Sequence, residues 1–393
     1  MLYTDFKGKK LSMLGFGTMR LPTAEGEIDE KQVEAMTEYA IRHGVNYFDT
    51  AVPYHEGLSE VVMGRVLNKY PRDTWYLADK FPGHQIAQSY DPKAVFEEQL
   101  EKCGVDYFDF YLLHNVYENS IQTYQDPKWG ILDYFKEQKR LGRIKHLGFS
   151  CHGSVELLKE FLDWCGDDME FCQIQLNWLD WTLQNAKAKA ALLNERRIPI
   201  MVMEPLRGGR LCRLTEAETA PLKALRPEAA AAEWGLRFLQ DIPGVAVILS
   251  GMSDRAQMEA NIASFDQAAP LASQEREALF RLAETMKEAV PCTACRYCTA
   301  HCPMELNIPM LLAAYNEFKF NPGFMASMKL DALPENKRPA ACIGCGACAA
   351  ICPQKIDIPA AMKEFADKLA SMPSWADMCR QREEAAKKLK EQK

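Results

Sequence analysis

The sequence predicts an α/β fold in which a closed (β/α)8 TIM barrel is followed by a small, mainly α-helical domain. Short apolar runs alternate eight times with longer segments of helical periodicity, which is typical of repeated βα units. This region, residues 13–265, has the roughly 250 residues of such a barrel. Eight of the 14 cysteines then lie between residues 292 and 352, which indicates a separate domain.

Eight segments are expected to form the barrel strands. Each is a nearly continuous apolar run, as expected for parallel strands that are covered on both faces. Their ranges are 13–21, 46–51, 75–80, 108–114, 144–150, 171–178, 198–206 and 245–251. An open, doubly wound parallel sheet is the alternative that this pattern leaves open.

Amphipathic segments follow the expected strands and are predicted to be helices on the outside of the barrel. Examples are residues 31–44, 92–104, 227–240 and 255–265. Residues 3–14 are expected to form a hairpin that turns at Lys7-Gly8 and closes the lower end of the barrel.

The cysteine spacing and the helical segment before it place the domain boundary near residue 290. The expected divisions are a barrel at 1–270, a connecting helix at 271–290, a cysteine-rich domain at 291–379 and a charged tail at 380–393.

Composition and charge indicate an ordinary globular protein. The chain has 393 residues, 48% hydrophobic and 26% charged, and its net charge of -7 gives no reason to expect nucleic acid or an anionic membrane as partner. No run approaches the roughly 18 apolar residues of a membrane span, and the start lacks an apolar signal segment. We therefore expect a cytoplasmic protein. Since stable disulfides are rare in that compartment, the cysteines point to metal binding or catalysis.

Four polar residues lie at the carboxyl ends of successive expected strands or just after them. They are Asp49, Tyr54, Lys80 and His114. Singly, they could be a helix cap, a packed loop residue, a surface charge and a core histidine. Together they form an acid–base set, because a nearby cation can tune a phenol whose ordinary pKa is about 10. Tyr54 would donate the proton, Lys80 would tune it, Asp49 would orient the lysine, and His114 would bind the substrate oxygen.

Three motifs around these residues resemble the aldo-keto reductase family. They are FDTAVPY at 48–54, LADK at 77–80 and YLLHN at 111–115, and the resemblance covers about two thirds of the chain. It implies a nicotinamide-dependent carbonyl reductase or alcohol dehydrogenase. It also implies that Asp49, Tyr54, Lys80 and His114 are the catalytic tetrad.

The resemblance further implies contacts to NAD(P)(H) in loops that follow the strands. The residues are Gly17, Thr18, Met19, Ser150, Gln173, Asn177, Pro205, Leu206, Gly208, Gly251, Ser253, Arg255, Gln257 and Asn261. The loop after the eighth strand leads into a helix N-terminus, where free amides suit a phosphate. Cys151 and Met203 replace a usual asparagine and a stacking aromatic. Gln257 stands where the family often has a basic residue that binds the 2'-phosphate of NADPH. Arg255, two residues away, could bind this phosphate instead, so the choice between NADH and NADPH stays open.

Two cysteine runs share the spacing C-x2-C-x2-C-x3-C followed by proline. In two-cluster ferredoxins, three cysteines of one run and the fourth of the other hold each [4Fe-4S] cluster. The expected ligand sets are Cys292, Cys295 and Cys298 with Cys352, and Cys342, Cys345 and Cys348 with Cys302. A pair of zinc sites is the alternative. The long connection between the runs resembles the α-helical ferredoxin type of succinate dehydrogenase. The six other cysteines are interpreted as small buried hydrophobes.

These features predict an oxidoreductase that reduces a carbonyl or oxidises an alcohol with NAD(P)(H). Its ferredoxin module would pass electrons to or from a ferredoxin-like or flavoprotein partner. Because a hydride carries two electrons and a cluster passes one, FMN in the phosphate site is a further candidate cofactor. Two alternatives stay open: a self-sufficient reductase with structural clusters, and an electron-transfer protein whose barrel is not catalytic.

Overall fold

The computed structural model of the chain describes residues 1–85, 87, 89–118, 120–286, 290–320, 330 and 333–372. Cys379 and the predicted tail at 380–393 lie outside these residues. The chain divides into two compact units, Met1–Ala283 and Glu284–Lys393. Each unit is described by itself below.

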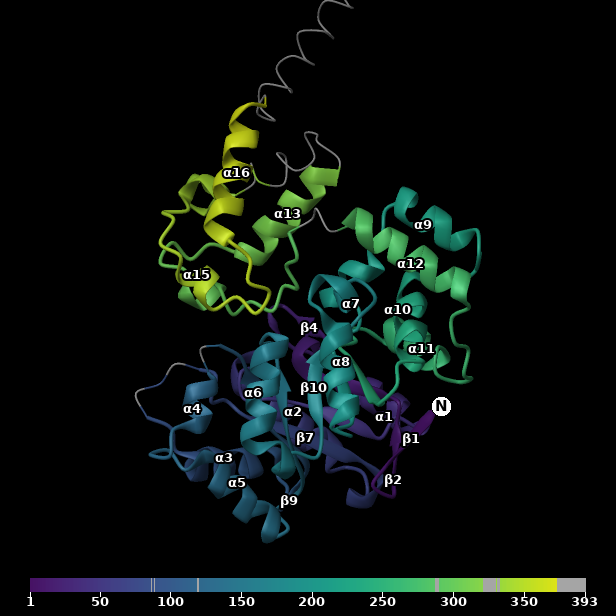
Figure 1. Ribbon diagram of the computed structural model, residues 1–393, viewed down its shortest axis with the longest axis vertical. Helices are drawn as coiled ribbons and strands as arrows, with labels where there is room; N and C mark the ends of the chain where they lie inside the picture. The colour runs from purple at the N-terminus through teal and green to yellow at the C-terminus, as the bar shows by residue number, and fades with distance from the viewer. Residues whose placement is uncertain are drawn as a thin grey trace, which may run out of the picture. The chain divides into compact units, whose positions relative to one another are not determined.

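The first unit is built around a closed barrel of eight parallel strands (Figure 1). Around the barrel they follow the chain order and close between β12 and β3. They are β3 (Leu14–Gly17), β6 (Tyr47–Asp49), β7 (Tyr76–Phe81), β8 (Phe108–Val116), β9 (Ile144–Cys151), β10 (Cys172–Gln175), β11 (Ile200–Met203) and β12 (Val245–Ser250). Each predicted run overlaps one of these strands. The predicted (β/α)8 barrel is therefore confirmed, and the open sheet is excluded.

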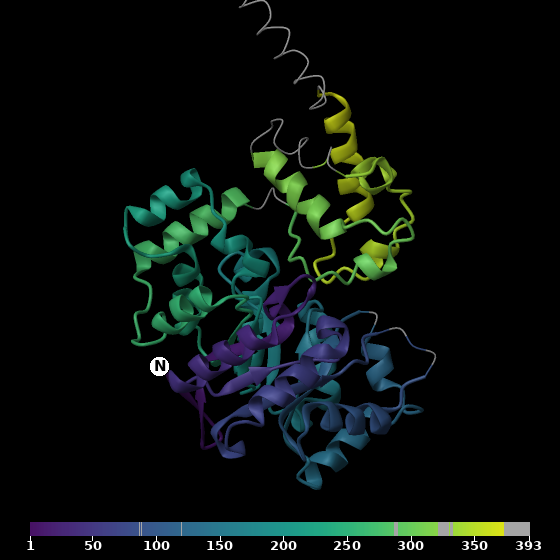
Figure 2. The ribbon, with the colours of Figure 1, turned by 180° about the vertical axis from the view of Figure 1, so that it is seen from behind.

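Helices lie around the outside of this barrel (Figures 1 and 2). They are α1 (Glu30–Arg42), α2 (Leu58–Leu67), α3 (Pro92–Cys103), α4 (Ile121–Gln125), α5 (Ile131–Arg140), α6 (Val155–Cys165), α7 (Asp180–Leu183), α8 (Ala186–Glu195), α9 (Glu216–Lys223), α10 (Ala231–Gln240), α11 (Arg255–Ala263) and α12 (Ser273–Met286). Several begin where a side chain accepts a backbone N–H of the first turn, as Asp29, Asp91 and Ser154 do. Such caps satisfy amides that would otherwise have no partner at a helix start.

An N-terminal hairpin closes the lower end of the barrel. Its strands β1 (Tyr3–Phe6) and β2 (Lys9–Ser12) are joined through Lys7 and Gly8, whose φ values of 51° and 80° suit a two-residue turn. The ring of Phe6 is buried and packs edge-on against Phe110, with ring centroids 5.2 Å apart. The predicted hairpin and its position are therefore confirmed.

Glu170 links this hairpin to the barrel wall. Its carboxylate pairs with Lys7 at 3.1 Å, with His146 at 2.5 Å and with Lys139. Burial acts to raise the pKa of Glu170, but hydrogen bonds from the three partners outweigh it and lower the pKa to about 2. A carboxyl whose pKa falls on folding stabilises the fold above its ordinary pKa, and this stabilisation is lost as the pH falls toward the folded value.

We expect Glu170→Gln to destabilise the barrel by about 2 kcal/mol at neutral pH, because it removes hydrogen bonds to charged groups. Below about pH 4.5 the difference in unfolding free energy between the two proteins should shrink, because the stabilisation from ionised Glu170 is then progressively lost. Thermal unfolding followed by circular dichroism between pH 7 and 3 measures this. Glu137→Gln is the matched control, because it breaks an exposed pair with Arg140 and should change stability little. A deficit that does not depend on pH would contradict the prediction.

The second unit contains two similar segments offset by 50 residues, so that Cys292 corresponds to Cys342. The helices α13 (Ile308–Phe320) and α16 (Ile358–Ala370) begin at matched positions. They pack together through Tyr315 and Phe365, whose ring centroids are 4.9 Å apart. The remaining α-helix with described bounds is α15 (Ala347–Ala350). The predicted mainly helical domain is thus confirmed. No helix in the described parts of the chain is long and apolar enough to cross a membrane.

Candidate active site

The four predicted acid–base residues lie at one end of the barrel. Asp49 is the last residue of β6, Lys80 lies near the end of β7, and His114 lies near the end of β8. Tyr54 follows β6 and opens the short 3-10 helix Tyr54–Gly57. Because the strands are parallel, their carboxyl ends meet at one rim, and the four side chains converge there.

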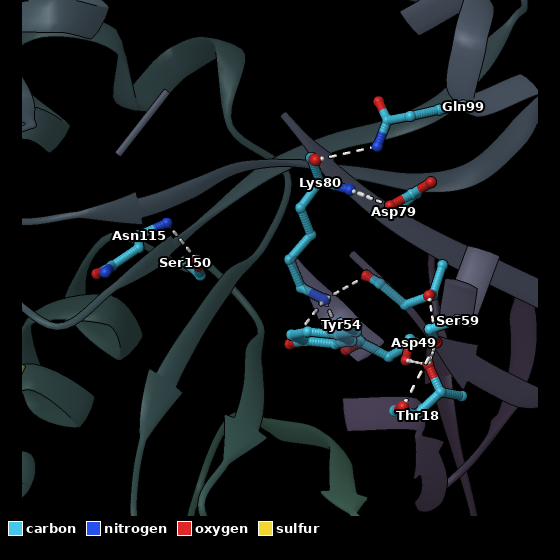
Figure 3. Close-up of polar contacts among 10 residues, drawn as sticks. Thr18, Asp49, Tyr54, Ser59, Asp79, Lys80, Gln99, Asn115 and Ser150 are labelled. Atoms are coloured by element: carbon cyan, nitrogen blue, oxygen red, sulfur yellow. Dashed lines mark hydrogen bonds and ion pairs between the residues drawn. The ribbon is translucent and has the colours of Figure 1, made fainter. Parts of the chain in front are cut away.

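Lys80 is the centre of this group (Figure 3). Its ammonium donates to Asp49 Oδ1 at 2.7 Å, to the carbonyl oxygen of Thr50 at 2.6 Å and to the Tyr54 hydroxyl at 3.4 Å. Lys80 is fully buried, and Asp49 is only 2% exposed. The ion pair therefore fixes a cation beside the phenol in a site with little water.

The backbone of Asp49 is held by hydroxyl groups. Thr18 Oγ1 donates to the carbonyl oxygen of Asp49 at 2.8 Å and bonds Ser59 Oγ at 2.8 Å. Ser59 Oγ also bonds Thr50 Oγ1 at 2.9 Å (Figure 3). The hydroxyl of Thr18, a predicted cofactor contact, thus positions Asp49.

The Tyr54 hydroxyl keeps its proton at neutral pH. Burial raises its pKa well above the ordinary value of 10.0, and the negative charges of Asp49 and Glu204 act in the same direction. Lys80 was expected to lower this pKa. Burial, the largest effect, raises it instead, although the ammonium lies 3.4 Å from the hydroxyl. The arrangement gives a proton donor that is fully protonated before reaction.

His114 is a neutral imidazole in this site. Burial lowers its pKa well below 6.5, and the charges of His84, Lys80 and His152 act in the same direction. Its ring centroid lies 4.4 Å from that of His84 and 6.4 Å from that of Tyr54. Its Nδ1 has no hydrogen-bond partner among the described residues. A neutral imidazole can orient a carbonyl oxygen without competing with Tyr54 as the acid.

The eight predicted ligand cysteines of the second unit line two separate cavities. The first is lined by Cys292, Cys295, Cys298 and Cys352, and the second by Cys302, Cys342, Cys345 and Cys348. Apart from the cysteines, both linings are mostly apolar. Backbone N–H groups also donate to sulfur, from Ala294 to Cys292 Sγ at 3.4 Å and from Leu306 to Cys302 Sγ at 3.5 Å. Each cavity thus offers four thiols and amide donors, which fits an iron–sulfur cluster.

Residues 13–284 match the Aldo/keto reductase family, and residues 291–356 match the 4Fe-4S dicluster domain. The chain belongs to the aldo/keto reductase family. Its family barrel is followed by an iron–sulfur domain, as the sequence predicted.

Curated proteins and a solved structure are similar to part of this chain. NADH-specific methylglyoxal reductase of Escherichia coli (strain K12) is 27% identical over 51% of this chain and 65% of its own length. Probable aldo-keto reductase 1 of Glycine max is 27% identical over 52% of this chain and 58% of its own. The chain thus matches less than two thirds of either relative. A solved aldo-keto reductase of Bacillus halodurans, in its holo form, covers 72% of this chain and 96% of its own, with 27% identity and a TM-score of 0.58.

The predicted nicotinamide contacts of this aldo/keto reductase lie at the same rim as Tyr54. Ser150 and Gln173 are within β9 and β10, and Asn177 follows β10. The Gln173 side chain is 2% exposed, and its Oε1 has no partner among the described residues. By contrast, Asn177 Nδ2 donates to Asp180 Oδ2 at 2.6 Å, and Ser150 Oγ accepts the N–H of Asn115 at 2.7 Å. Gln173 therefore has an amide oxygen to offer a ligand, whereas Ser150 and Asn177 already bind within the barrel.

The other predicted cofactor residues follow strand ends. Gly17 and Met19 lie at the end of β3 and just after it, and Pro205, Leu206 and Gly208 follow β11. Gly251 follows β12 directly, and Asn261 lies on α11, where its Nδ2 donates to Ser250 Oγ at 3.0 Å.

The loop between β12 and α11, the expected phosphate site, is held by internal hydrogen bonds. Asp254 Oδ1 accepts the N–H of Gln257 at 2.8 Å, and Gln257 Oε1 accepts the N–H of Ser253 at 3.1 Å. Arg255 pairs with Glu259 at 2.7 Å. Two amides of this loop are therefore bonded by this chain's own side chains, because an aspartate at the N-cap is a preferred internal partner.

Three rim residues were missed by sequence reasoning. Burial lowers the pKa of His84 to about 4 and that of His152 to about 3. Glu204 has a left-handed φ of 57°, its Oε2 has no partner among the described residues, and burial raises its pKa. His152 and Glu204 directly follow the last residues of β9 and β11. Inspecting every strand end, rather than three, would have found both.

The cysteines outside the two runs are mostly buried, as interpreted. Cys103, Cys151, Cys165 and Cys172 are buried, whereas Cys212 is exposed. Cys212, the last residue of the short 3-10 helix Arg207–Cys212, is the exception among the described ones.

Proposed function

We propose that this aldo/keto reductase reduces a small-molecule carbonyl with NAD(P)H at the rim around Tyr54. We also propose that its clusters exchange electrons with a ferredoxin-like or flavoprotein partner. One observation carries the first part: the buried Lys80 ammonium contacts both Asp49 and the Tyr54 hydroxyl, at 2.7 and 3.4 Å. This buried group can deliver a proton to the carbonyl oxygen, as carbonyl reduction requires.

When bound, the nicotinamide supplies a hydride to the carbonyl carbon. As the carbonyl π bond breaks, Tyr54 gives its proton to the oxygen and is left as a phenolate. Lys80 stabilises this developing negative charge, and Asp49 keeps the lysine in place. Neutral His114 orients the substrate oxygen. A proton from solvent then restores the phenol.

Burial keeps Tyr54 protonated at neutral pH, which is the form from which carbonyl reduction starts. For the nicotinamide end of the cofactor, the uncommitted amide oxygen of Gln173 is the best-supported contact.

We propose crossed ligation of the clusters, because each cavity is lined by three cysteines of one run and the fourth of the other. The link from these clusters to the barrel must reconcile one-electron with two-electron chemistry. A flavin handles both, so we propose FMN, or a substrate that accepts single electrons, as the bridge.

This coupling predicts an observable reaction. When the full protein with both clusters photoreduced is mixed anaerobically with a carbonyl substrate and no NAD(P)H, the clusters should reoxidise at least tenfold faster than without substrate. Two cluster electrons and two protons would then reduce one carbonyl to an alcohol. Stopped-flow absorption measures the rate of cluster reoxidation, and product analysis measures the amount of alcohol formed.

The test uses protein that is replete in any flavin it binds and active with NAD(P)H. The control is the alcohol product of the same substrate, which cannot accept the electrons. Equal reoxidation rates with carbonyl, with alcohol and without addition would contradict the coupling. The clusters would then be structural or docking elements beside an independent reductase.

A further inference from the structure

The two cysteine loops of the second unit have the same backbone shape but different residues. Residues 294 and 296 have φ values of 57° and 67°, and the matched residues 344 and 346 have 70° and 77°. The second loop has glycine at both positions, which adopts this left-handed region without strain. The first loop has Ala294 and Arg296, which do not. The sequence thus retains an arginine where its own repeat uses glycine.

Arg296 also gives the two cavities different electrostatics. It is the one charged residue among those that line the first cavity, and no charged residue lines the second. It forms no ion pair with any other residue in the described part of the chain. The first cavity therefore has a positive charge at its exposed wall, with no ion-pair partner among the described residues, and the second has none.

We propose that Arg296 makes the two clusters unequal by raising the reduction potential of the cluster held in the first cavity. One-electron reduction of a cluster adds one negative charge, which a nearby cation stabilises, and the charge around a cluster is among the factors that set its potential. Ala294 has the same strained backbone without a charge, so the proposed effect comes from the Arg296 side chain. This proposal goes beyond the barrel reaction and rests on the cluster sites proposed above.

The test is Arg296→Gly in the full chain with both clusters, prepared anaerobically. Two reduction steps are followed by electron paramagnetic resonance during a potentiometric titration. We expect one step to shift to lower potential by about tenfold in its equilibrium constant, which is 59 mV for one electron. The other step should stay in place. The melting temperature should not fall, because glycine suits the left-handed backbone.

Two further variants separate charge from backbone strain. Ala294→Gly relieves the same strain two residues away without a change of charge, and both potentials should match the unchanged protein. Arg296→Lys keeps the charge and should retain most of the higher potential. The proposal is overturned if Arg296→Gly leaves both steps in place, or moves them equally. A wrong assignment of the ligands would instead appear as an unexpected pattern of iron loss in the cysteine variants described in the Discussion.

Discussion

Tyr54→Phe should lower carbonyl reduction by about 100-fold to 10,000-fold, the usual effect of losing a general acid. The change removes only the hydroxyl that lies 3.4 Å from the Lys80 ammonium and leaves the ring in place. The Lys80–Asp49 pair at 2.7 Å does not depend on this hydroxyl, so the barrel should stay folded. The loss should appear in kcat more than in KM, because the proton moves in the transition state.

The measurement is NADH or NADPH oxidation over a panel of carbonyl compounds, with circular dichroism to confirm folding. Tyr47→Phe is the matched control, since Tyr47 is also a buried tyrosine of the β6 region and its hydroxyl has no partner among the described residues. That variant should keep near-normal activity. Near-normal reduction by Tyr54→Phe would contradict the assignment of Tyr54 as the proton donor.

The barrel could be predicted because its strands are buried on both faces. β8 and β9 are almost continuous apolar runs, and their predicted starts at residues 108 and 144 agree with the structure. The first predicted strand, 13–21, is too long. β3 ends at Gly17, because the Thr18 hydroxyl turns inward to bond the Asp49 carbonyl, and such a distant contact leaves no periodic signal.

Short exposed elements were harder to predict. The two-residue strands β4 (Thr23–Ala24) and β5 (Glu27–Ile28) were missed, because four residues that are largely exposed show no alternation of apolar and polar side chains. Gly26, with a φ of 92°, is the local signal for this turn.

The acid–base group could be predicted because its members lie at strand ends, which meet at one rim in any parallel barrel. What sequence could not provide is the balance of charges around them. The pKa of Tyr54 depends on burial and on Glu204, which is 150 residues away along the chain. Likewise, the bonds among Asp254, Gln257 and Ser253 that occupy the expected phosphate amides depend on side-chain conformations.

Cys302→Ser should remove one whole cluster and leave the other, so that iron falls from about eight to about four atoms per chain. Cys302 follows Cys298 closely in sequence, yet it lines the cavity of Cys342, Cys345 and Cys348. The short 3-10 helix Thr299–His301 lies between Cys298 and Cys302 and carries the chain from one cavity to the other. We therefore expect the cluster of the second run to be lost.

Double substitutions show which cluster has gone. With crossed ligation, adding Cys345→Ser to Cys302→Ser removes a second ligand of the same cluster, and about four irons should remain. Adding Cys295→Ser instead damages the other cluster, and almost no iron should remain. Local ligation within each run would reverse these two results, because Cys295 and Cys302 would then share a cluster. Iron and sulfide analysis of the anaerobic proteins thus separates the two arrangements, and the crossed one requires both runs to fold together around their clusters.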